Sequence, residues 1–358
     1  MIIDITELKT GEELVIKMLI PPLFNYANKV ECWNDIREEL LGGQMARWLF
    51  TPYFVGEIAG EVVGSMSYFT PADTRDIGLV EFVHTAERHR GKGIASTLLT
   101  KLIERFRVDR GLALYLCTNN PIAGMLYEKH GFWYNVGDGM RNVTFGTEDF
   151  DKNYLAFYGT ARVRDATWSD LPRASALYNH PEPQWFIKDY LAHSFRDTRF
   201  ERHFVKLMRR IENKRGALLV LENHQQRVVG VAALERFDTF YEQHVALLSF
   251  RVCPSYFEQV PELLNAAAKK AKELSITTIQ IYIADCDDEQ IQLVKKAGFS
   301  YEARLRNRLR NEDRWMDLLV YTLLLPGTAR PLRSKGDYYG GRKQWQEERV
   351  ASNVKRDA

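Results

Sequence analysis

Hydrophobic residues in the first 150 positions follow two periods, and together these periods predict a mixed α/β domain. Short apolar or alternating runs indicate strands, and apolar residues spaced three and four apart indicate helices. The expected elements are, in chain order, a strand at 2–5, helices at 12–26 and 31–41, a hairpin of 48–58 with 62–69, a strand at 79–84, a helix from about 93, a strand at 112–117, a short helix before Gly131 and a strand at 141–145. We expect the first domain to span residues 1–150.

The second half of the sequence repeats this order of elements with a period of roughly 155 to 160 residues. The expected elements are a strand at 161–164, a helix at 186–211, a hairpin of 216–221 with 228–235, a strand at 246–252, a helix at 261–274, a strand at 278–284, a helix at 288–299 and a closing strand pair within 303–325. A polar and aromatic linker is expected at 146–158. The second domain is therefore predicted at 151–326, and a polar, basic tail at 327–358.

Composition narrows the class of protein. With 358 residues the chain exceeds the usual size of one hydrophobic core, and 45% hydrophobic with 27% charged residues is typical of a globular protein. A formal net charge of +2 argues against an obligate nucleic-acid or anionic-membrane partner. No apolar run approaches the length of a membrane helix, roughly 20 residues, and the acidic start does not resemble a secretory signal. The cysteines Cys32, Cys117, Cys253 and Cys286 are scattered, as expected for reduced thiols in the cytoplasm.

The segment between strand 79–84 and the helix after it carries the strongest chemical signal. Residues 88–93 have the sequence RHRGKG. Two glycines in a strand-to-helix turn leave backbone amides accessible, and the helix adds its own unpaired amides and the positive end of its dipole. Such a turn holds a phosphate or pyrophosphate, and Arg88, Arg90 and Lys92 add positive charge at its rim.

Three nucleotide-binding patterns compete at this loop. A dinucleotide-binding fold needs a third glycine after Gly91 and Gly93, where the chain has Ser96, and the spacing of a P-loop is absent. The remaining pattern, Arg or Gln, two residues, Gly, one residue, then Gly or Ala, fits 88–93 without a gap. A second segment supports it, because after strand 112–117 the chain has Asn120, Ala123, Tyr127, Gly131 and Phe132.

These two segments, in this order and at this separation, resemble the GNAT superfamily of N-acetyltransferases, which bind acetyl-coenzyme A (acetyl-CoA). The resemblance implies two GNAT-like domains, each a central mixed, mostly antiparallel sheet flanked by helices. It also implies that the fourth strand splays from the fifth, so that its free amides hold the pantetheine arm and the acetyl carbonyl. The implied cofactor-binding residues are Val83, His84, Thr85, Arg88, Arg90, Gly91, Lys92, Gly93, Ile94, Ala95, Ser96, Asn120 and Tyr127.

Acetyl transfer to an amine requires a neutral amine, stabilisation of the tetrahedral oxyanion and a proton for the departing thiolate. By resemblance, the hydroxyl of Tyr127 lies near the coenzyme sulfur and acts as the acid; the alternative is a tyrosine that only packs. Asn120 either holds the pantetheine arm or caps the helix that follows it. No cluster of His, Cys and Asp residues has metal-ligand spacing, so we expect acetyl-CoA as cosubstrate and no metal.

Glu81 is the candidate general base, directly or through a water, because a partly buried carboxylate near the splay can have a raised pKa. The alternatives are an exposed strand residue or one that binds a cationic substrate. Strict alternation along the strand puts Val83 and Thr85 on the face of Glu81. Phe82 and His84 then point to the other face, so His84 ranks below Glu81 as the base.

The second copy departs from the pattern at the loop. Residues 254–260 contain no glycine and no basic residue, and Glu258 would repel a pyrophosphate. The counterpart of Tyr127, four positions before Gly298, is Val294. We therefore expect the first domain alone to bind acetyl-CoA, with a degenerate second domain that packs on it and helps to shape the acceptor site.

The resulting prediction is an acyl-CoA-dependent N-acetyltransferase, a monomer or homodimer, that acetylates a primary amine of a small molecule by direct attack in a ternary complex. Tandem chains of the superfamily that modify small molecules favour this acceptor. Two alternatives stay open: a non-catalytic acetyl-CoA sensor that regulates a partner, and a protein or peptide N-acetyltransferase. Trp33, Tyr53, Tyr68 and Phe69 either line the acceptor site or belong to the core.

Overall fold

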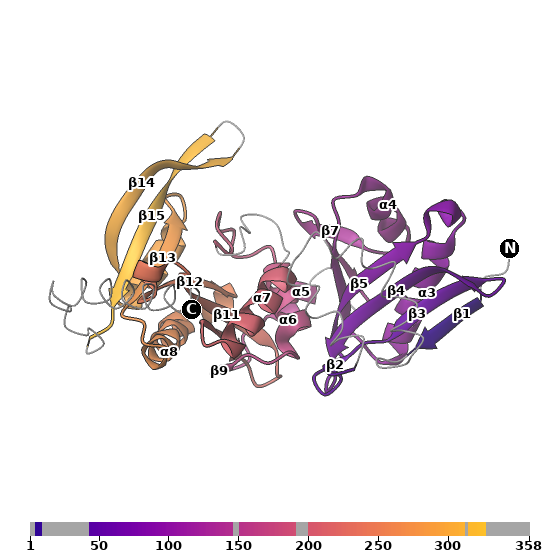
Figure 1. The fold of residues 1–358 in the computed structure, drawn as a ribbon, viewed down its shortest axis with the longest axis horizontal. Helices are drawn as coiled ribbons and strands as arrows, with labels where there is room; N and C mark the ends of the chain where they lie inside the picture. Colours follow the sequence, from indigo (N-terminus) through magenta and orange to yellow (C-terminus); the bar gives the residue numbers. More distant parts are fainter. Residues whose placement is uncertain (1–3, 9–42, 146–149, 191–199, 312–313, 327–358) are drawn as a thin grey trace, which may run out of the picture.

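The computed structural model describes residues 4–8, 43–145, 150–190, 200–311 and 314–326. Within these ranges the chain forms two mixed sheets flanked by helices, one after the other along the long axis of the molecule (Figure 1). This confirms the predicted fold class. No helix of the described ranges is both long and apolar enough to cross a membrane. The helices expected at 12–26 and 31–41 lie outside the described residues.

The first sheet has the strand order β1-β3-β4-β5-β6-β8-β7, with β2 paired to β4. Its neighbouring strands are antiparallel except for β5 and β6, which are parallel. A two-residue turn joins β3 to β4, and its residues Ala59 and Gly60 both have positive φ, as this type of hairpin requires. The strands are β1 (Asp4–Leu8), β2 (Leu49–Phe50), β3 (Tyr53–Ile58), β4 (Glu61–Pro71), β5 (Ile77–Thr85), β6 (Ala113–Cys117), β7 (Trp133–Val136) and β8 (Gly139–Val143).

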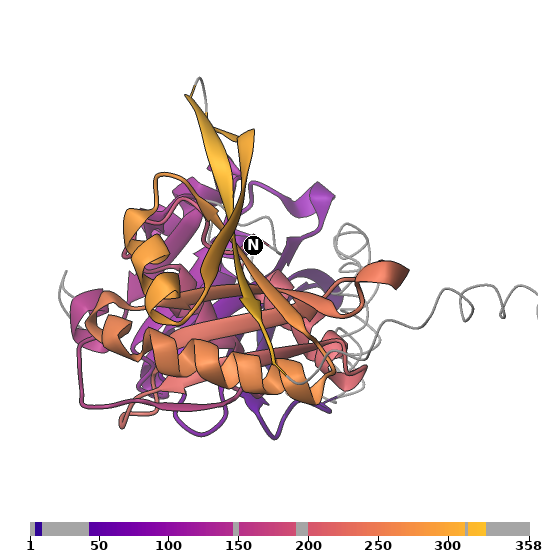
Figure 2. The ribbon, with the colours of Figure 1, turned by 90° about the vertical axis from the view of Figure 1, so that its left-hand side faces the viewer.

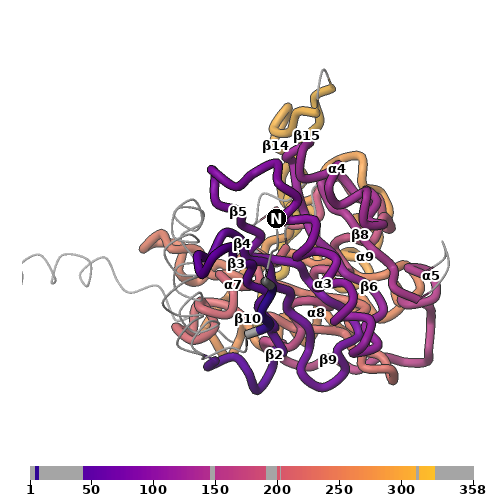
Figure 3. The backbone as a smooth tube through the Cα atoms, turned by 90° about the vertical axis from the view of Figure 1, so that its right-hand side faces the viewer, coloured from indigo at the N-terminus to yellow at the C-terminus, as the bar shows by residue number. Residues whose placement is uncertain are grey.

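Helix α3 (Ile94–Val108) packs across β3, β4 and β5 with its apolar stripe (Figure 3). The ring of Phe106 meets that of Tyr68 edge-on, with centroids 5.3 Å apart. Contact with β4 is close enough to require glycine at position 64, because a Cβ on Gly64 would lie 2.9 Å from Cγ2 of Ile94. The shorter α4 (Pro121–Lys129) adds its buried residues to the same core.

The second sheet has the order β14-β15-β13-β12-β11-β10-β9 and is antiparallel except for β12 and β13. Its strands are β9 (Arg162–Asp165), β10 (Gly216–Glu222), β11 (Val228–Arg236), β12 (Val245–Val252), β13 (Thr278–Ala284), β14 (Ser300–Asn311) and β15 (Arg314–Leu324). Its helices are α6 (Asp170–Tyr178), α7 (Phe200–Glu212), η3 (Phe240–Glu242), η4 (Pro254–Gln259), α8 (Val260–Glu273) and α9 (Asp288–Lys296). The ends of β14 and β15 project from the domain as a two-stranded ribbon (Figures 1 and 2).

Two expectations for the second half are wrong. Residues 186–190 are not helical and α7 begins at Phe200, so the helix expected at 186–211 is not formed as one piece. The apolar residues Phe186 and Ile187 pack into the second domain in an irregular conformation. The expected linker contains a short helix, α5 (Phe150–Tyr154), whose two terminal aromatic side chains are buried.

Helix α6 connects the two sheets. It contacts β4 and β5 of the first sheet and β11 and β12 of the second. One continuous apolar cluster crosses the seam, with Phe69 and Leu79 from the first domain and Leu177 and Phe204 from the second. The two domains therefore share part of their hydrophobic core.

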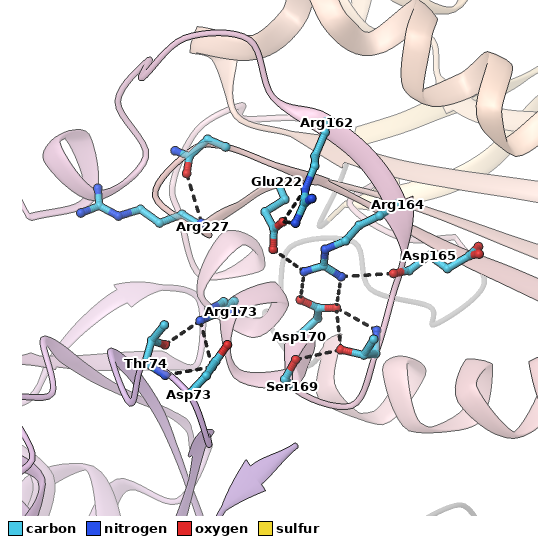
Figure 4. A network of polar contacts seen from close by, with 12 residues as sticks. Asp73, Thr74, Arg162, Arg164, Asp165, Ser169, Asp170, Arg173, Glu222 and Arg227 are labelled. Atoms are coloured by element: carbon cyan, nitrogen blue, oxygen red, sulfur yellow. Dashed lines mark hydrogen bonds and ion pairs between the residues drawn. The ribbon is translucent and has the colours of Figure 1, made fainter. Parts of the chain in front are cut away.

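A polar cluster lies at the edge of this seam (Figure 4). Arg173 of α6 donates to Oγ1 of Thr74 at 2.5 Å, and its Nε lies 3.5 Å from Oδ1 of Asp76. Tyr154 donates to the other carboxylate oxygen of Asp76 at 2.6 Å. The second domain and the segment before it thus hold the turn from which β5 begins.

Candidate functional site

Strands β5 and β6 separate soon after they pair. Their parallel ladder begins at Ile77 and ends at the pair Leu79 and Tyr115. Beyond this pair β5 continues to Thr85 along β4, without β6 as a partner. Among the described strands, none forms a ladder with this edge of β5 beyond Leu79.

A β-bulge in β5 changes which side chains share a face. Ser67 pairs with Glu81 and Ser65 pairs with His84, so β5 has one more residue than β4 between the two pairs. Phe82 takes the irregular conformation, with a φ of 55°. Because Ser65 and Ser67 lie on one face of β4, their partners Glu81 and His84 lie on that face too. The alternation expected from the sequence, with His84 opposite Glu81, is wrong.

The shared face is the one turned away from α3. Gly64 and Tyr68, on the other face of β4, contact α3. The ring of Phe82 meets that of Phe69 with centroids 5.5 Å apart, on the side away from α3. Thr85 pairs with Gly64 and so lies on the α3 side. Glu81 and His84 are both half-buried, on the face of the sheet turned away from α3.

The loop between β5 and α3 has the geometry of an anion cradle. It passes through the turn η2 (Glu87–His89) to Gly91 and Gly93, whose φ angles are 75° and 81°. No described atom lies within 4 Å of a Cβ placed on either glycine, so a ligand can approach the backbone. Gly93 caps α3 without a side-chain hydrogen bond, which leaves the amides of 94–96 unpaired by any cap.

The basic residues expected at this loop are exposed, and two of them have partners. Arg88 forms an ion pair with Glu61 of β4. Arg90 donates from Nε to the carbonyl oxygen of Thr85 at 3.4 Å. Lys92 lies between the two glycines and is exposed. Because the ion pair of Arg88 is also exposed, it contributes little and does not prevent the side chain from turning to an anion.

His84 is half-buried near the end of β5. Burial lowers the pKa of its imidazole, and the positive charge of Arg90 lowers that pKa further. The imidazole is therefore neutral at pH 7. Among the described residues, none forms a hydrogen bond with its ring nitrogens.

Two expected site residues lie on α4. Asn120 caps the helix, since its Oδ1 accepts from the amides of Ile122 at 3.0 Å and Ala123 at 3.5 Å. Of the two roles expected of Asn120, the structure shows the helix cap. Tyr127 is 5% exposed and packs against Phe132, with ring centroids 5.7 Å apart. Its packing role is thus present, and the role of its hydroxyl stays a prediction.

One polar link between α3 and α4 was missed. Nδ1 of His130 lies 2.8 Å from the carbonyl oxygen of Leu126 and must carry the proton, because a carbonyl only accepts. Nε2 then accepts from the hydroxyl of Ser96 at 3.1 Å. The separation of 34 residues between His130 and Ser96 hides this contact from the sequence. The hydroxyl of Ser96 therefore points towards α4. The cofactor contact that we expect from Ser96 comes from its backbone amide.

The corresponding loop of the second domain has a different geometry. Turn η4 leads directly into α8, and no residue of 254–260 has a positive φ. Its polar side chains bind the backbone of the segment before β9. Ser255 donates to the carbonyl oxygen of Leu155 at 2.9 Å. The side-chain amide of Gln259 bonds both the amide and the carbonyl of Ala161, each at 2.8 Å.

In the second domain, β12 and β13 also separate, after a ladder that ends at Leu247 and Gln280. Past this point β12 carries Arg251, which is fully buried. Its guanidinium donates to four backbone carbonyls, one in the last turn of α6 and three in the stretch that follows it. They belong to Leu177 at 3.2 Å, His180 at 2.7 Å, Glu182 at 3.2 Å and Pro183 at 3.2 Å.

The same stretch continues to the start of α9. Asp287 occupies the position before α9, and its carboxylate accepts from the amide of Phe186 at 2.9 and 3.0 Å. Trp185 stacks on Phe257 of η4, with ring centroids 5.9 Å apart. We call residues 177–187 the bridging segment, because they connect β12, η4 and α9. In chain order these three elements correspond to β5, η2 and α4 of the first domain.

The aromatic residues considered for the acceptor site belong to the core. Tyr53, Tyr68 and Phe69 are each 0% exposed. Trp33 lies outside the described residues. Across the described part of the chain, no three His, Cys, Asp or Glu side chains are grouped as a metal ion would require.

Comparison with known proteins identifies two regions of similarity. Residues 21–132 match the model of the "Acetyltransferase (GNAT) family". Residues 163–320 match the model of an "Acetyltransferase (GNAT) domain". Among curated proteins, none matches the sequence.

Several solved structures are similar to about half of the chain. One is the ribosomal-protein-alanine N-acetyltransferase from Brucella melitensis, with 26% identity, coverage of 46% of this chain and 99% of that one, and a TM-score of 0.39. An N-acetyltransferase from Staphylococcus aureus Mu50 has 22% identity, the same coverages and a TM-score of 0.40. A phosphinothricin acetyltransferase from Sinorhizobium meliloti, solved with acetyl-CoA, has 17% identity, coverage of 49% and 95%, and a TM-score of 0.42.

Proposed function

Because the chain carries two GNAT acetyltransferase domains in tandem, we propose that the first domain transfers an acetyl group from acetyl-CoA to a primary amine of a small molecule. The amine attacks the thioester directly in a ternary complex. The observation that carries this proposal is the cradle of Gly91, Gly93 and the amides of 94–96, located where β5 leaves β6. A diphosphate site and a free strand edge thus adjoin each other, as a long phosphorylated thiol carrier requires.

In this proposal the pyrophosphate binds at the start of α3. The amides of 94–96 and the positive end of the helix dipole hold its oxygens, and Arg88, Arg90 and Lys92 supply charge from the rim. The pantetheine arm follows the free edge of β5, where the amides of 83–85 replace the missing ladder. Asn120 uses its oxygen for the helix cap, so its amide nitrogen remains the group that can donate to the arm.

The chemistry needs three groups near the thioester. The backbone amide of Val83 donates to the carbonyl oxygen as negative charge develops on it. Tyr127 protonates the departing thiolate, since its hydroxyl can give its proton to the sulfur as the C–S bond breaks. The proton of the amine is taken on the face of β5 that carries Glu81 and His84. Glu81 also gives that face a negative charge, which attracts an ammonium acceptor.

One coenzyme per chain is part of the proposal. The second domain lacks left-handed glycines at 254–260, and its polar groups there already bind the backbone near Leu155 and Ala161. The bridging segment, 177–187, connects β12 to α9, where the pantetheine arm would have to pass. Binding of coenzyme in the second domain would require breaking the hydrogen bonds of buried Arg251, which is costly.

The seam between the domains favours a small acceptor. Helix α6 covers β4 and β5 along Phe69 and Leu79, on the same face as Glu81 and His84. Counting only the described residues, the end of β5 is the part of that face left uncovered beside the splay. A short amine needs no more surface than this, whereas a folded protein acceptor would have to displace part of the second domain.

The test combines calorimetry with a thiol-release assay on the full chain. We expect one molecule of acetyl-CoA per chain, and release of free thiol that depends on a small primary amine from a panel. Tight binding without turnover on any amine or peptide would identify a sensor instead. Faster acetylation of peptide amino termini than of every small amine would contradict the proposed acceptor class.

A further inference from the structure

The bulge of β5 gives His84 a position that strict alternation would not. It lies on the face of Glu81, and it is paired across the sheet with Ser65. It also stands two residues before Ala86, the residue that precedes η2, at the end of β5 that lies past the splay. The imidazole of His84 therefore lies near the end of β5 that does not pair with β6, on the face turned away from α3.

The state of this imidazole suits proton transfer. Half-burial and the charge of Arg90 keep it neutral, and within the described ranges its ring nitrogens make no hydrogen bond. His130, by contrast, uses both ring nitrogens to connect α3 with α4. A neutral imidazole with an accessible lone pair accepts a proton at physiological pH without prior ionisation.

On the basis of the proposed acetyl transfer, we propose that His84 is the catalytic base that takes the proton from the attacking amine. The nitrogen lone pair of the amine attacks the thioester carbon, and the N–H proton passes to the imidazole as the C–N bond forms. The C–S bond then breaks, and the thiolate takes its proton from Tyr127. Exchange with water returns the proton from His84 to solvent and restores Tyr127, so the products are an amide and a free thiol.

The charges around His84 are consistent with this role. Among the described residues, the charged groups on its side are Arg90, in the following loop, and Glu81, earlier on the same strand. The neighbours across the sheet, Ser65 on β4 and Val55 on β3, carry no charge. Arg90 favours the neutral imidazole before transfer.

The pH dependence of kcat/KM distinguishes His84 from Glu81 as the base. With an amine that the full chain acetylates, we expect an acid limb with an apparent pKa below 6.5. His84→Gln should lower kcat by about 100-fold, within the usual range for loss of a general base, and should abolish this limb. Glu81→Gln should keep the limb. His224→Gln, at an exposed turn of the second domain, is the matched control and should behave as the wild type.

Calorimetry with acetyl-CoA accompanies each variant, and an affinity within about threefold of the wild type verifies that the site is folded. Should His84→Gln fail this criterion, His84→Asn takes its place in the same assay. If the His84 variant keeps its turnover and its acid limb, or if Glu81→Gln removes the limb instead, His84 is not the base. Wild-type chain that acetylates no amine would overturn the proposed function itself, and this assignment with it.

Discussion

Tyr127 combines a packing role that the structure contains with a chemical role that we propose. Its ring belongs to the core of the first domain and meets Phe132. Tyr127→Phe keeps the ring and removes only the hydroxyl, so it separates the two roles. We expect kcat to fall by about 10- to 1000-fold, as for loss of a proton donor, with unchanged affinity for acetyl-CoA. Steady-state kinetics with calorimetry measure both, and an unaltered kcat would mean that the residue only packs.

A second residue-scale feature lies outside the candidate site. His203 of α7 is fully buried between two carboxylates: its Nδ1 contacts Asp189 and its Nε2 lies 2.6 Å from Glu235. Burial by itself would lower the pKa of His203, but Asp189 and Glu235 outweigh it and raise the pKa to about 9. Lys206 and Arg210 approach Glu235 from the same helix. The cluster therefore depends on a charged imidazole.

This cluster makes the stability of the fold depend on pH. Because the pKa of His203 is higher in the folded chain than in the unfolded one, its contribution is complete below about pH 6.5. It disappears as the pH rises through about 9. At most about 3 kcal/mol of unfolding free energy is involved. We expect Tm to fall between pH 6.5 and 9.5 more steeply for the wild type than for His203→Gln. Parallel Tm profiles in scanning calorimetry would refute the assignment.

At the scale of elements, two loops of similar position differ in what they can bind. The loop before α3 has exposed backbone, whereas the loop before α8 binds its own chain. Gly93→Glu places a carboxylate in the cradle and a side chain on a left-handed backbone. We expect the Kd for acetyl-CoA to rise at least about 100-fold, since like charges brought together cost several kcal/mol.

The matched control for this change is Gly298→Glu in the second domain. Gly298 also has a positive φ, 90°, and no described atom lies near a Cβ placed on it. The backbone cost, about 1 kcal/mol, is therefore similar, and we expect a lower Tm with an unchanged Kd. Equal loss of binding in both variants, measured by calorimetry, would mean that the cradle is not the coenzyme site.

Elements with strong local signals could be predicted from the sequence. The hairpin of β3 and β4 follows from Ala59 and Gly60 between alternating strands, and α3 from apolar residues at helical spacing. The bulge could not be predicted, because Phe82 adopts a positive φ that no local residue type signals. Strict alternation therefore places His84 on the wrong face of β5, and the catalytic roles of Glu81 and His84 stay predictions.

Contacts between distant segments were equally hidden from the sequence. The hydrogen bond from Arg251 to the carbonyl of His180 joins residues 71 positions apart, so the sequence does not reveal that β12 holds the bridging segment. The apolar residues near Phe186, in the same segment, were therefore interpreted as part of a helix. Strand β7 is short and lies directly after a glycine turn, so its sequence does not show the alternation of apolar and polar residues that identifies a strand. In each case tertiary packing, and not local propensity, determined the conformation.

At the scale of the whole molecule, the seam gives the second domain a structural role. Phe69 and Leu79 of the first sheet are buried in the same cluster as Leu177 of α6. Without α6 these side chains would face water, at a cost of about 25 cal/mol for each Å² of apolar surface. We infer that the two domains fold and unfold as one unit.

The polar edge of the seam provides a test of this coupling. Arg173 is 2% exposed and bridges Thr74 and Asp76, so Arg173→Ala removes one partner from each of these two residues of the first domain. We expect a loss of about 2 kcal/mol, as a lower Tm of a single calorimetric transition, because the apolar cluster still joins the sheets. Lys296→Ala breaks an exposed ion pair with Glu258 in the second domain and should leave Tm unchanged. Two separate transitions, or a shift confined to one domain, would contradict a shared core.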